Sequence, residues 1–476
     1  MESKTLDALL EGYPASVAIN ASAVREKATG SPVFVVLDDD PTGTQSVSDL
    51  PVLTSWEDSD FAWAFETGKP AVYVMTNSRS LAPDQAKAVN EEVVDAALRV
   101  AADVGLKVAF VSRSDSTLRG HFPLEPDTIA ARIEATGTVV DGVVIVPAFG
   151  DAGRITVDSI HYAGSLATGF VPVAQTEFAK DATFGYSHSD IPGWVEEKTQ
   201  GKTKAEDVIT IPLDLLRTDQ EAVVALLRKA SKRQAIAPDI VTEEDLRLLS
   251  LALIEAENQG STFIYRVGPP FVRARIGQDE HAPLSVEEVQ TSRGIAGDTA
   301  KGGLIVVGSH VGLTTRQLDQ LRARRHPVEL EIDVAKVLDP ALREGHLAEI
   351  SETAIKGLDT ENIVIRTSRL LVTGTSGDES LEISRQVSAA VVSVVQSILK
   401  QVKPRFVIAK GGITSSDVAS KGLSIRHAIV VGPMLPGIVS LWSPQDGPAQ
   451  GIPYIVFAGN VGNDESLADV ADKLSA

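Results

Sequence analysis

The chain has 476 residues and a formal net charge of −20 at pH 7, from 44 Lys and Arg against 64 Asp and Glu. This length suits two or three domains, and the acidic balance argues against non-specific nucleic-acid binding, because phosphate contacts need a basic surface. The absence of cysteine excludes disulfides, thiol nucleophiles and Cys-ligated metal centres.

Residues 1–12 are polar and acidic, without the basic start and apolar core of a signal peptide. No apolar run reaches the about 18 residues that a membrane span needs. We therefore expect a cytoplasmic protein that contacts neither membrane nor nucleic acid, and the sequence leaves a homodimer open.

In the first half of the chain, short apolar runs alternate with helical patterns. We predict strands at 33–37, 72–75, 108–111 and 143–146, and a helix at 82–104. Pro83 lies near the start of that helix and Gly105 follows its end, which is the expected asymmetry of helix termini. Strands that alternate with helices indicate a parallel sheet.

Residues 176–207 are polar and weakly periodic, and they could form a lid or an insertion. The residues that follow show the apolar spacing of helices and one more strand. We interpret residues 276–302 as a linker because they lack a sustained apolar face. After the linker the same rhythm restarts, with predicted strands at 304–307, 328–332, 362–367, 406–409, 428–431 and 454–457 and a helix at 378–400.

These elements predict an α/β protein of two domains, each a mostly parallel sheet flanked by helices. We place the first domain at 1–275 and the second at 303–476, and we expect the active site in the cleft between them.

Three adjacent carboxylates follow the first predicted strand, in the run Asp38 to Gly43. Open α/β sheets bind ligands at the carboxyl ends of their strands. Three neighbouring carboxylates are not all easily ionised without cations nearby, so at least one is a base, a metal ligand or a hydrogen-bond acceptor. The alternative is an acidic helix cap, which needs only one carboxylate. We predict that Asp39 or Asp40 is the catalytic base.

A second polar loop, Ser112 to His121, follows the strand at 108–111. Arg113 and Arg119 offer guanidinium forks for a carboxylate, while Asp115 and the hydroxyls suit sugar-type OH groups. The alternative is a polar helix start with exposed arginines. Arg79 lies at an analogous strand end and could join this cluster, although a lone surface arginine is the commoner explanation.

Three glycine-containing loops follow strands in the second half, at 308–315, 410–417 and 458–464. Glycines let backbone amides approach a phosphate, and the start of the following helix adds the positive end of its dipole. Strand-to-helix turns also need glycine for purely structural reasons, which leaves both explanations open. Neither a P-loop motif nor a GxGxxG after a strand is present.

A carboxylate and arginine pocket in one domain and a glycine-rich cradle in the other fit phosphoryl transfer. The first domain would hold the hydroxyl acceptor, the second the nucleotide, and closure would exclude water.

Three motifs, in this order, resemble the four-carbon acid sugar kinase family: Asp-Asp-x-Thr-Gly from Asp39, Asp-Ser-Thr-x-Arg-Gly from Asp115 and Gly-Gly-x-Thr-Ser from Gly411. The resemblance covers about residues 33–470. It implies an ATP- and Mg²⁺-dependent kinase for a small sugar acid such as threonate, erythronate or a 3-oxo-tetronate. The first domain would bind the acid and the second ATP.

By position, the resemblance implies roles on the substrate side for Asp39, Asp40, Thr42, Gly43, Asp115, Ser116, Thr117, Arg119 and Gly120. It implies nucleotide contacts for Ser309, Gly411, Gly412, Ile413, Thr414, Ser415 and Gly459, and the loop around Gly459 adds Asn460 and Gly462. Arg79 and Arg113 complete the predicted substrate site.

The chain departs from the family at Arg113, where many members have Lys, and at Asp38, where a small residue is commoner. These departures bear on the substrate more than on the reaction. Two alternatives stay open, a metal-dependent sugar-acid lyase or dehydratase and a non-catalytic protein that binds a sugar acid or a nucleotide. The sequence does not identify metal ligands.

Overall fold

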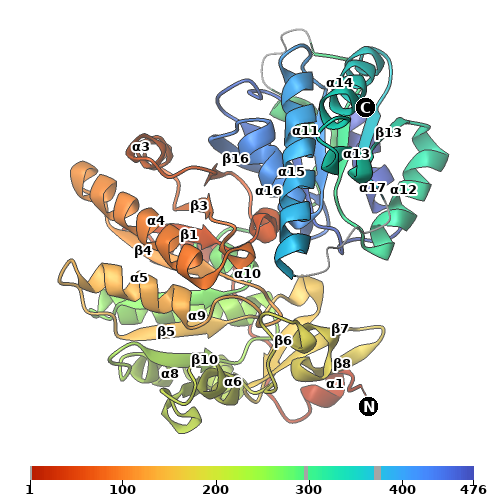
Figure 1. The fold of residues 1–476 in the computed structure, drawn as a ribbon. Helices are drawn as coiled ribbons and strands as arrows, with labels where there is room; N and C mark the ends of the chain where they lie inside the picture. Colours follow the sequence, from red (N-terminus) through yellow and green to blue (C-terminus); the bar gives the residue numbers. More distant parts are fainter. Residues whose placement is uncertain (1–2, 294–298, 369–376) are drawn as a thin grey trace. The chain divides into compact units, whose positions relative to one another are not determined.

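The computed structural model describes residues 3–293, 299–368 and 377–476, and the chain folds into two compact units (Figure 1). Unit 1 consists of Met1–Val47 and Trp56–Glu280, and unit 2 consists of Ser48–Ser55 and His281–Ala476. The segment Ser48–Ser55 therefore belongs to unit 2, although the chain on both sides of it belongs to unit 1.

Unit 1 is built on a parallel sheet with the strand order β3-β1-β4-β11-β5-β10-β9. Its strands are rich in Val and Ile and buried along most of their length, as expected for parallel strands covered on both faces. Their bounds are β1 Val33–Asp38, β3 Ala71–Met75, β4 Val108–Arg113, β5 Gly142–Val146, β9 Ile209–Ile211, β10 Gln234–Pro238 and β11 Phe263–Val267.

In unit 1, α4 packs with both α3 and α5, and α9 packs with α2, α7, α8 and α10. Figure 1 shows α4 between α3 and α5. A small antiparallel sheet adds β6 Arg154–Val157, β7 Ile160–Ser165 and β8 Gly169–Pro172. The helices are α1 Leu6–Leu9, α2 Ala21–Lys27, α3 Asp58–Glu66, α4 Pro83–Val104, α5 Leu124–Glu134, α6 Ile191–Lys198, α7 Leu213–Thr218, α8 Gln220–Leu227, α9 Glu243–Asn258 and α10 Pro270–Arg275.

The polar segment 176–207 is packed into unit 1 rather than lying apart from it. Its Tyr186 and Trp194 are buried in one apolar cluster with Val143 and Ile145 of β5. The aromatic side chains that interrupt this polar stretch therefore anchor it to the sheet.

Unit 2 has the strand order β13-β14-β12-β15-β18-β17-β16-β2. The strands from β13 to β18 in this order run parallel, and β17, β16 and β2 extend the sheet with antiparallel pairs. Their bounds are β2 Leu50–Leu53, β12 Leu304–Val307, β13 Val328–Ile332, β14 Ile363–Thr367, β15 Val407–Lys410, β16 His427–Leu435, β17 Ile438–Pro444 and β18 Tyr454–Phe457.

The helices of unit 2 include two packed pairs, α12 with α17 and α14 with α15. The predicted linker 276–302 contains α11, whose Val289 is buried in the apolar core of unit 2. Residues 294–298 of that prediction lie outside the described residues. The helices are α11 Val286–Ser292, α12 Gly312–Arg325, α13 Val334–Leu338, α14 Arg343–Leu358, α15 Gly377–Leu399, α16 Gly412–Asp417 and α17 Ser466–Ser475.

Strand register aligns the loops that the sequence singled out. In unit 1, Asp38 pairs with Met75 of β3 and with Arg113 of β4, and Arg113 pairs with Val267. In unit 2, Lys410 pairs with both Val307 and Phe457. The carboxyl ends of neighbouring strands therefore lie level with one another in each sheet.

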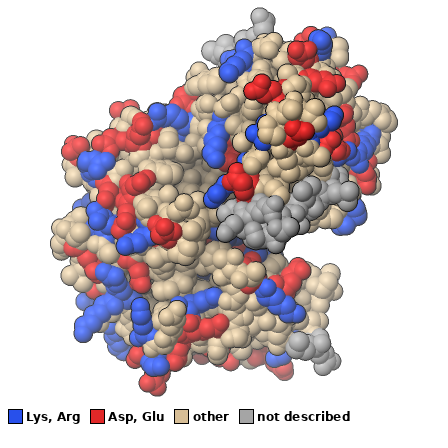
Figure 2. All heavy atoms as spheres, in the orientation of Figure 1, with Lys and Arg blue, Asp and Glu red and all other residues tan. Residues whose placement is uncertain are grey.

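The surface of the chain mixes both signs of charge. On the face drawn in Figure 2, Lys and Arg side chains are interspersed with Asp and Glu, and no continuous basic area is seen there.

Candidate functional site

Asp38, the last residue of β1, forms an ion pair with Arg113 of the neighbouring strand β4. Its carboxylate accepts hydrogen bonds from the guanidinium of Arg113, which also donates to the carbonyl of Asp40. Burial raises the pKa of Asp38 to about 7, despite the opposing effect of Arg113. A Cβ at Gly43 would collide with this ion pair, which explains why that position needs glycine.

Asp39 has one satisfied and one unsatisfied carboxylate oxygen. Oδ1 lies 3.2 Å from Arg79 Nη2 and 3.1 Å from Arg113 Nη2. Oδ2 is buried and has no hydrogen-bond partner among the described residues, and Gly120, with φ +120°, faces it. Burial raises the pKa of Asp39 above its ordinary value, although both arginines oppose the shift. A buried carboxylate oxygen without a donor is what a proton acceptor requires.

Asp40 is held as an anion by two arginines and by Thr42 of its own loop. Oδ1 accepts hydrogen bonds from the backbone N of Thr42 at 3.0 Å and from its hydroxyl at 2.5 Å, and Oδ2 lies 3.1 Å from Arg79 Nη2. Burial works against ionisation, but Arg79, Arg113 and the two Thr42 hydrogen bonds together lower the pKa of Asp40. Asp40 caps the 3₁₀ turn Pro41–Ser46, so the capping alternative describes this residue well.

Arg79 joins the cluster and links the two polar loops of unit 1. Besides Asp39 and Asp40, its guanidinium pairs with Asp115 Oδ1 at 3.5 Å. Asp115 Oδ2 accepts a hydrogen bond from Arg119 Nε at 2.8 Å and another from the Thr117 hydroxyl. Burial opposes ionisation of Asp115, yet Arg79 and Arg119 hold its pKa well below its usual range.

Three buried residues that the sequence analysis missed support these loops. Glu125 of α5 accepts hydrogen bonds from the hydroxyls of Ser78 and Ser112, and burial raises its pKa to about 7. Arg266 of β11 donates to the carbonyls of Asp115 and Arg119, and His161 Nε2 lies 2.8 Å from the carbonyl of Ser116. A charged residue inside the apolar strand 263–267 was the available signal for Arg266.

In unit 2 the three glycine loops follow β12, β15 and β18, which are neighbouring strands. The Thr314 hydroxyl lies 3.0 Å from Ser309 Oγ and 3.0 Å from the carbonyl oxygen of Gly459, and so joins two of the loops. Cβ atoms at Gly308 and Gly459 would collide with the side chains of Thr414 and Ser309. The loops approach closely because these positions are glycine.

Several predicted residues have structural partners within the loops. The Ser415 hydroxyl donates to the carbonyl of Ala409 at 2.8 Å and is buried. Gly411 has φ +126° and Gly462 φ +84°, backbone conformations that favour glycine. Gly412 begins α16 and Asn460 is exposed.

Lys410, at the end of β15, is a buried cation that the sequence analysis did not assign to a site. Its Nζ donates to the carbonyl of Ala458 at 2.7 Å and lies 3.8 Å from the ring centroid of Phe457. Burial lowers the pKa of Lys410 to about 7. Lys410 therefore ties the loop after β15 to the loop after β18.

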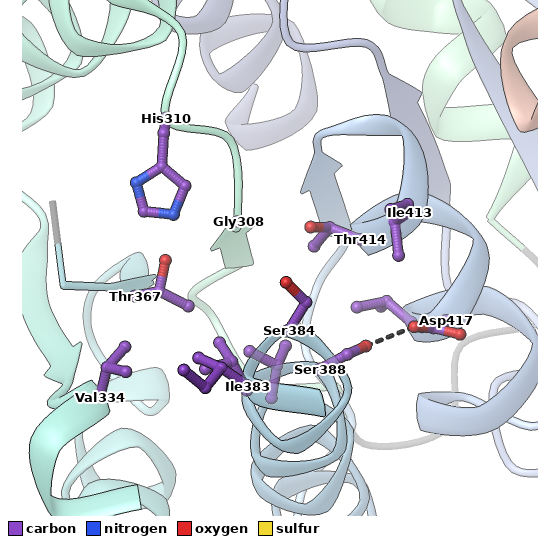
Figure 3. Close-up of a pocket in the computed structure, with 13 residues that line it drawn as sticks. Gly308, His310, Val334, Thr367, Ile383, Ser384, Ser388, Ile413, Thr414 and Asp417 are labelled. Carbon is purple, nitrogen blue, oxygen red and sulfur yellow. Dashed lines mark hydrogen bonds between the residues drawn. The ribbon is translucent and has the colours of Figure 1, made fainter. Parts of the chain in front are cut away.

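A cavity of about 190 Å³ opens in unit 2 beside these loops (Figure 3). Gly308, His310, Ile413 and Thr414 contribute to it from the glycine loops, and Thr367 and Ser384 lie around the same space. The Ser388 hydroxyl donates to Asp417 at its edge, and the rest of the lining is aliphatic: Val334, Ile383, Val387, Val391 and Val418. Of the predicted nucleotide residues, Ile413 and Thr414 line this cavity.

In the described ranges, no group of three or more His, Asp or Glu side chains is arranged to hold a metal ion. None of the helices there combines the length and hydropathy needed to cross a membrane.

Two domain families match the chain. The model of the sugar-binding N-terminal domain matches residues 34–275, and that of the nucleotide-binding C-terminal domain matches residues 304–467. The chain belongs to the four-carbon acid sugar kinase family. The resemblance read from its three motifs is thereby confirmed, as is the α/β, two-domain fold class.

Solved structures show the same fold at low sequence identity. A protein from Salmonella typhimurium LT2, provisionally named a tRNA synthase, is 17% identical, with a TM-score of 0.65 over 92% of this chain and 98% of that one. Haemophilus influenzae protein HI1011, assigned to the family DUF1537, is 18% identical, with a TM-score of 0.60 over 92% and 99% of the two chains. Among curated proteins, no significant match was found.

Proposed function

We propose that the protein is an ATP-dependent kinase that phosphorylates a hydroxyl of a four-carbon sugar acid such as threonate, erythronate or a 3-oxo-tetronate. The observation that carries this proposal is the buried, unpartnered Oδ2 of Asp39, within a cluster of arginines in a sugar-binding domain. The nucleotide-binding domain in the same chain supplies the expected phosphoryl donor.

In this proposal Asp39, rather than Asp40, is the general base. Asp40 Oδ1 already accepts two hydrogen bonds from Thr42 and its pKa is lowered, so it is a poor proton acceptor. Asp39 has a raised pKa and an oxygen without a donor. Arg79 and Arg113 bind the other oxygen and fix the carboxylate in place.

The proposed reaction is a direct transfer. The acceptor oxygen forms a bond to the γ-phosphorus of ATP, the bond from that phosphorus to the bridging oxygen breaks, and ADP leaves. The proton of the acceptor hydroxyl goes to Asp39 Oδ2. Ser116, Thr117 and the amide of Gly120 are proposed to position the acid, and Thr42 and Gly43 to shape the loop that carries the base.

In unit 2, the proposed nucleotide residues are Ser309, the run Gly411 to Ser415, Gly459, Asn460 and Gly462. Closely approaching glycine loops suit phosphates, and the aliphatic cavity beside them suits a flat base. Mg²⁺ would arrive with the nucleotide, since it is usually bound by one or two carboxylates together with substrate phosphates. It would supply charge neutralisation of the transferring phosphoryl group.

A panel of four-carbon sugar acids assayed with ATP and Mg²⁺ for ADP release tests this function. We expect at least one acid to support ADP release in wild type and not in Asp39→Asn. A sugar-acid lyase or dehydratase would consume the acid without ATP, and a binding protein would show affinity without turnover. Either result would replace the kinase proposal. The proposed cytoplasmic location and the homodimer are tested separately by fractionation and by sedimentation.

A further inference from the structure

Arg154 is the first residue of β6, and no carboxylate among the described residues pairs with its guanidinium. In the part of the chain that the structure describes, Arg154 forms no ion pair, and its Nε is buried without a hydrogen-bond partner. Nη1 donates to the carbonyl of Ala152, two residues away. Burial lowers the pKa of Arg154, and Arg119 adds to this effect while Asp115 opposes it. An unmatched, largely desolvated cation is costly unless an anion binds beside it.

The other arginines of unit 1 near Asp115 have protein partners. Arg79 pairs with three carboxylates, Arg113 with two, and Arg266 donates to backbone carbonyls and lies over the Trp194 ring. Arg119 pairs with Asp115 and, at 3.6 Å, with Asp181. Arg79 and Arg266 also keep a buried Nε without a hydrogen-bond partner. Among the described residues, Arg154 differs from them in having neither a carboxylate partner nor a hydrogen bond to the loop that carries Asp115, since it donates only to the carbonyl of Ala152.

Phe178 holds Arg154 next to Arg119. The guanidinium carbon of Arg119 lies 5.3 Å from the centroid of the Phe178 ring, and that of Arg154 lies 5.5 Å from it. Cation–π contacts of this kind fix a guanidinium without using its N–H donors. Phe178 belongs to the polar segment 176–207, whose Tyr186 donates a hydrogen bond to the carbonyl of Thr117. The segment is thus built onto the same loop that carries Asp115 and Arg119.

We propose that Arg154 and Arg119, backed by Phe178, form the subsite that binds the carboxylate of the substrate and so selects a sugar acid over a neutral sugar. This inference depends on the proposed kinase function, because that function is what makes the substrate a sugar acid. Arg154 Nε has no hydrogen-bond partner among the described residues, and a planar guanidinium can bind a carboxylate in a bidentate geometry. Asp115 lies beside the subsite as a hydroxyl acceptor, so the carboxylate and the hydroxyl-bearing carbons of the acid are bound by different groups.

The test compares Arg154→Gln and Arg154→Lys with the wild-type chain, using the best acid from the panel and the primary amide of the same acid. We expect Arg154→Gln to raise KM for the acid by roughly tenfold to a hundredfold, the range for losing a charge-assisted hydrogen bond. KM for ATP should not change, and Arg154→Lys should recover part of the loss. The matched control is Arg132→Gln, because Arg132 pairs with Asp95 at a more exposed position of unit 1.

The decisive readout is the ratio of kcat/KM for the acid to kcat/KM for the amide. A carboxylate subsite requires this ratio to collapse in Arg154→Gln, whereas a purely structural role would lower both values together. An unchanged ratio overturns the proposal.

Failure of the kinase function would show itself differently, as absence of ADP release from wild type with every acid. Calorimetric titration of the same acids into the full chain then decides. Binding that is lost in Arg154→Gln and kept in Arg132→Gln supports the subsite, whereas equal binding by both variants, or no binding by wild type, overturns it.

Discussion

In unit 1 the strand ends carry charged side chains, whereas in unit 2 they carry glycine. Asp38, Arg113 and the loops beside them form a network of ion pairs, in which each buried charge is held by another. In unit 2 the loops after β12, β15 and β18 approach through backbone and hydroxyl contacts. Both arrangements lie at the carboxyl ends of parallel strands, so the same topology presents two different chemistries.

This difference indicates which amino-acid substitutions each unit should be most sensitive to. A charge network fails when one partner is removed, because the remaining charge is left buried and unpaired. Loops that approach closely through glycine are disturbed when a side chain fills the space between them.

Asp39→Asn should abolish most of the activity while leaving the fold intact. A general base contributes about 10²–10⁴-fold to the rate, so we expect kcat to fall by at least about 100-fold. The melting temperature should change little, because Arg79 keeps Asp40 and Asp115 as partners and Arg113 keeps Asp38, so neither arginine is left unpaired. Because the pKa of Asp39 is raised, the wild-type rate should fall as the pH drops through that raised value. The rate of the variant should not show this decrease at low pH. Asp95→Asn, at an exposed ion pair, is the control. Equal activity of Asp39→Asn and wild type would end the role of Asp39 as base.

Gly308→Ala should weaken nucleotide binding without affecting the acid. The new Cβ would collide with the Thr414 side chain and push the two loops apart. We expect ATP affinity to fall by at least about tenfold, equivalent to roughly 1.4 kcal/mol, in a calorimetric titration. Gly345→Ala is the matched control, since a Cβ there meets no atom within 4 Å. If both variants bind ATP equally well, the close approach of the loops is not needed for the nucleotide.

Lys410 is a buried cation beside the glycine loops of unit 2, and its protonation can be measured through the stability of the protein. Its pKa is lowered to about 7 by burial from the ordinary 10.5. Between these values the unfolded chain binds more protons than the folded one, so the free energy of unfolding should rise with pH across this window.

Relative to Lys410→Met, which lacks the group, wild type should therefore gain on the order of 1–3 kcal/mol from about pH 7 to about pH 10. Chemical denaturation at several pH values measures the difference. Lys400→Met, at an exposed lysine, controls for loss of charge. If the difference in unfolding free energy between wild type and Lys410→Met does not change with pH, Lys410 stays charged in the folded protein. Unit 2 would then also hold a buried cation at its loops.

Ile413→Val should give the smallest effect. Ile413 lines the unit 2 cavity and is 64% exposed, so a bound nucleotide could cover it. Loss of one buried methylene costs about 0.8 kcal/mol at most, and we expect ATP affinity to fall by roughly twofold to fourfold. Leu166→Val, at an exposed position of unit 1, should leave it unchanged. An unchanged affinity in Ile413→Val would place the nucleotide away from this side chain.

Much of this arrangement could be predicted from the sequence because it depends on residues that are close together in the chain. Apolar runs predicted the strands, and the polar residues that end them predicted which loops carry chemistry, since register follows once the sheet is parallel. Contacts between segments far apart in the sequence could not be predicted. Glu125, Arg154 and Phe178 carry no motif, and their importance comes from the groups that the fold brings beside them.

The same limit applies to the boundaries of the units. The helix α11 lies within the predicted linker, because its single buried Val289 gives too weak a pattern to detect. The strand β2 is a four-residue apolar segment, and nothing in its sequence indicates that it belongs with residues beyond 281.

The position of β2 in the chain has a consequence for biosynthesis. Its antiparallel partner β16 begins roughly 370 residues later, at His427. At about 5–20 residues per second, a ribosome needs on the order of 20–75 s to make that stretch. The strand β2 is thus synthesised early and must wait for its partner in unit 2, and a fragment that starts at residue 281 would lack a strand of its own sheet.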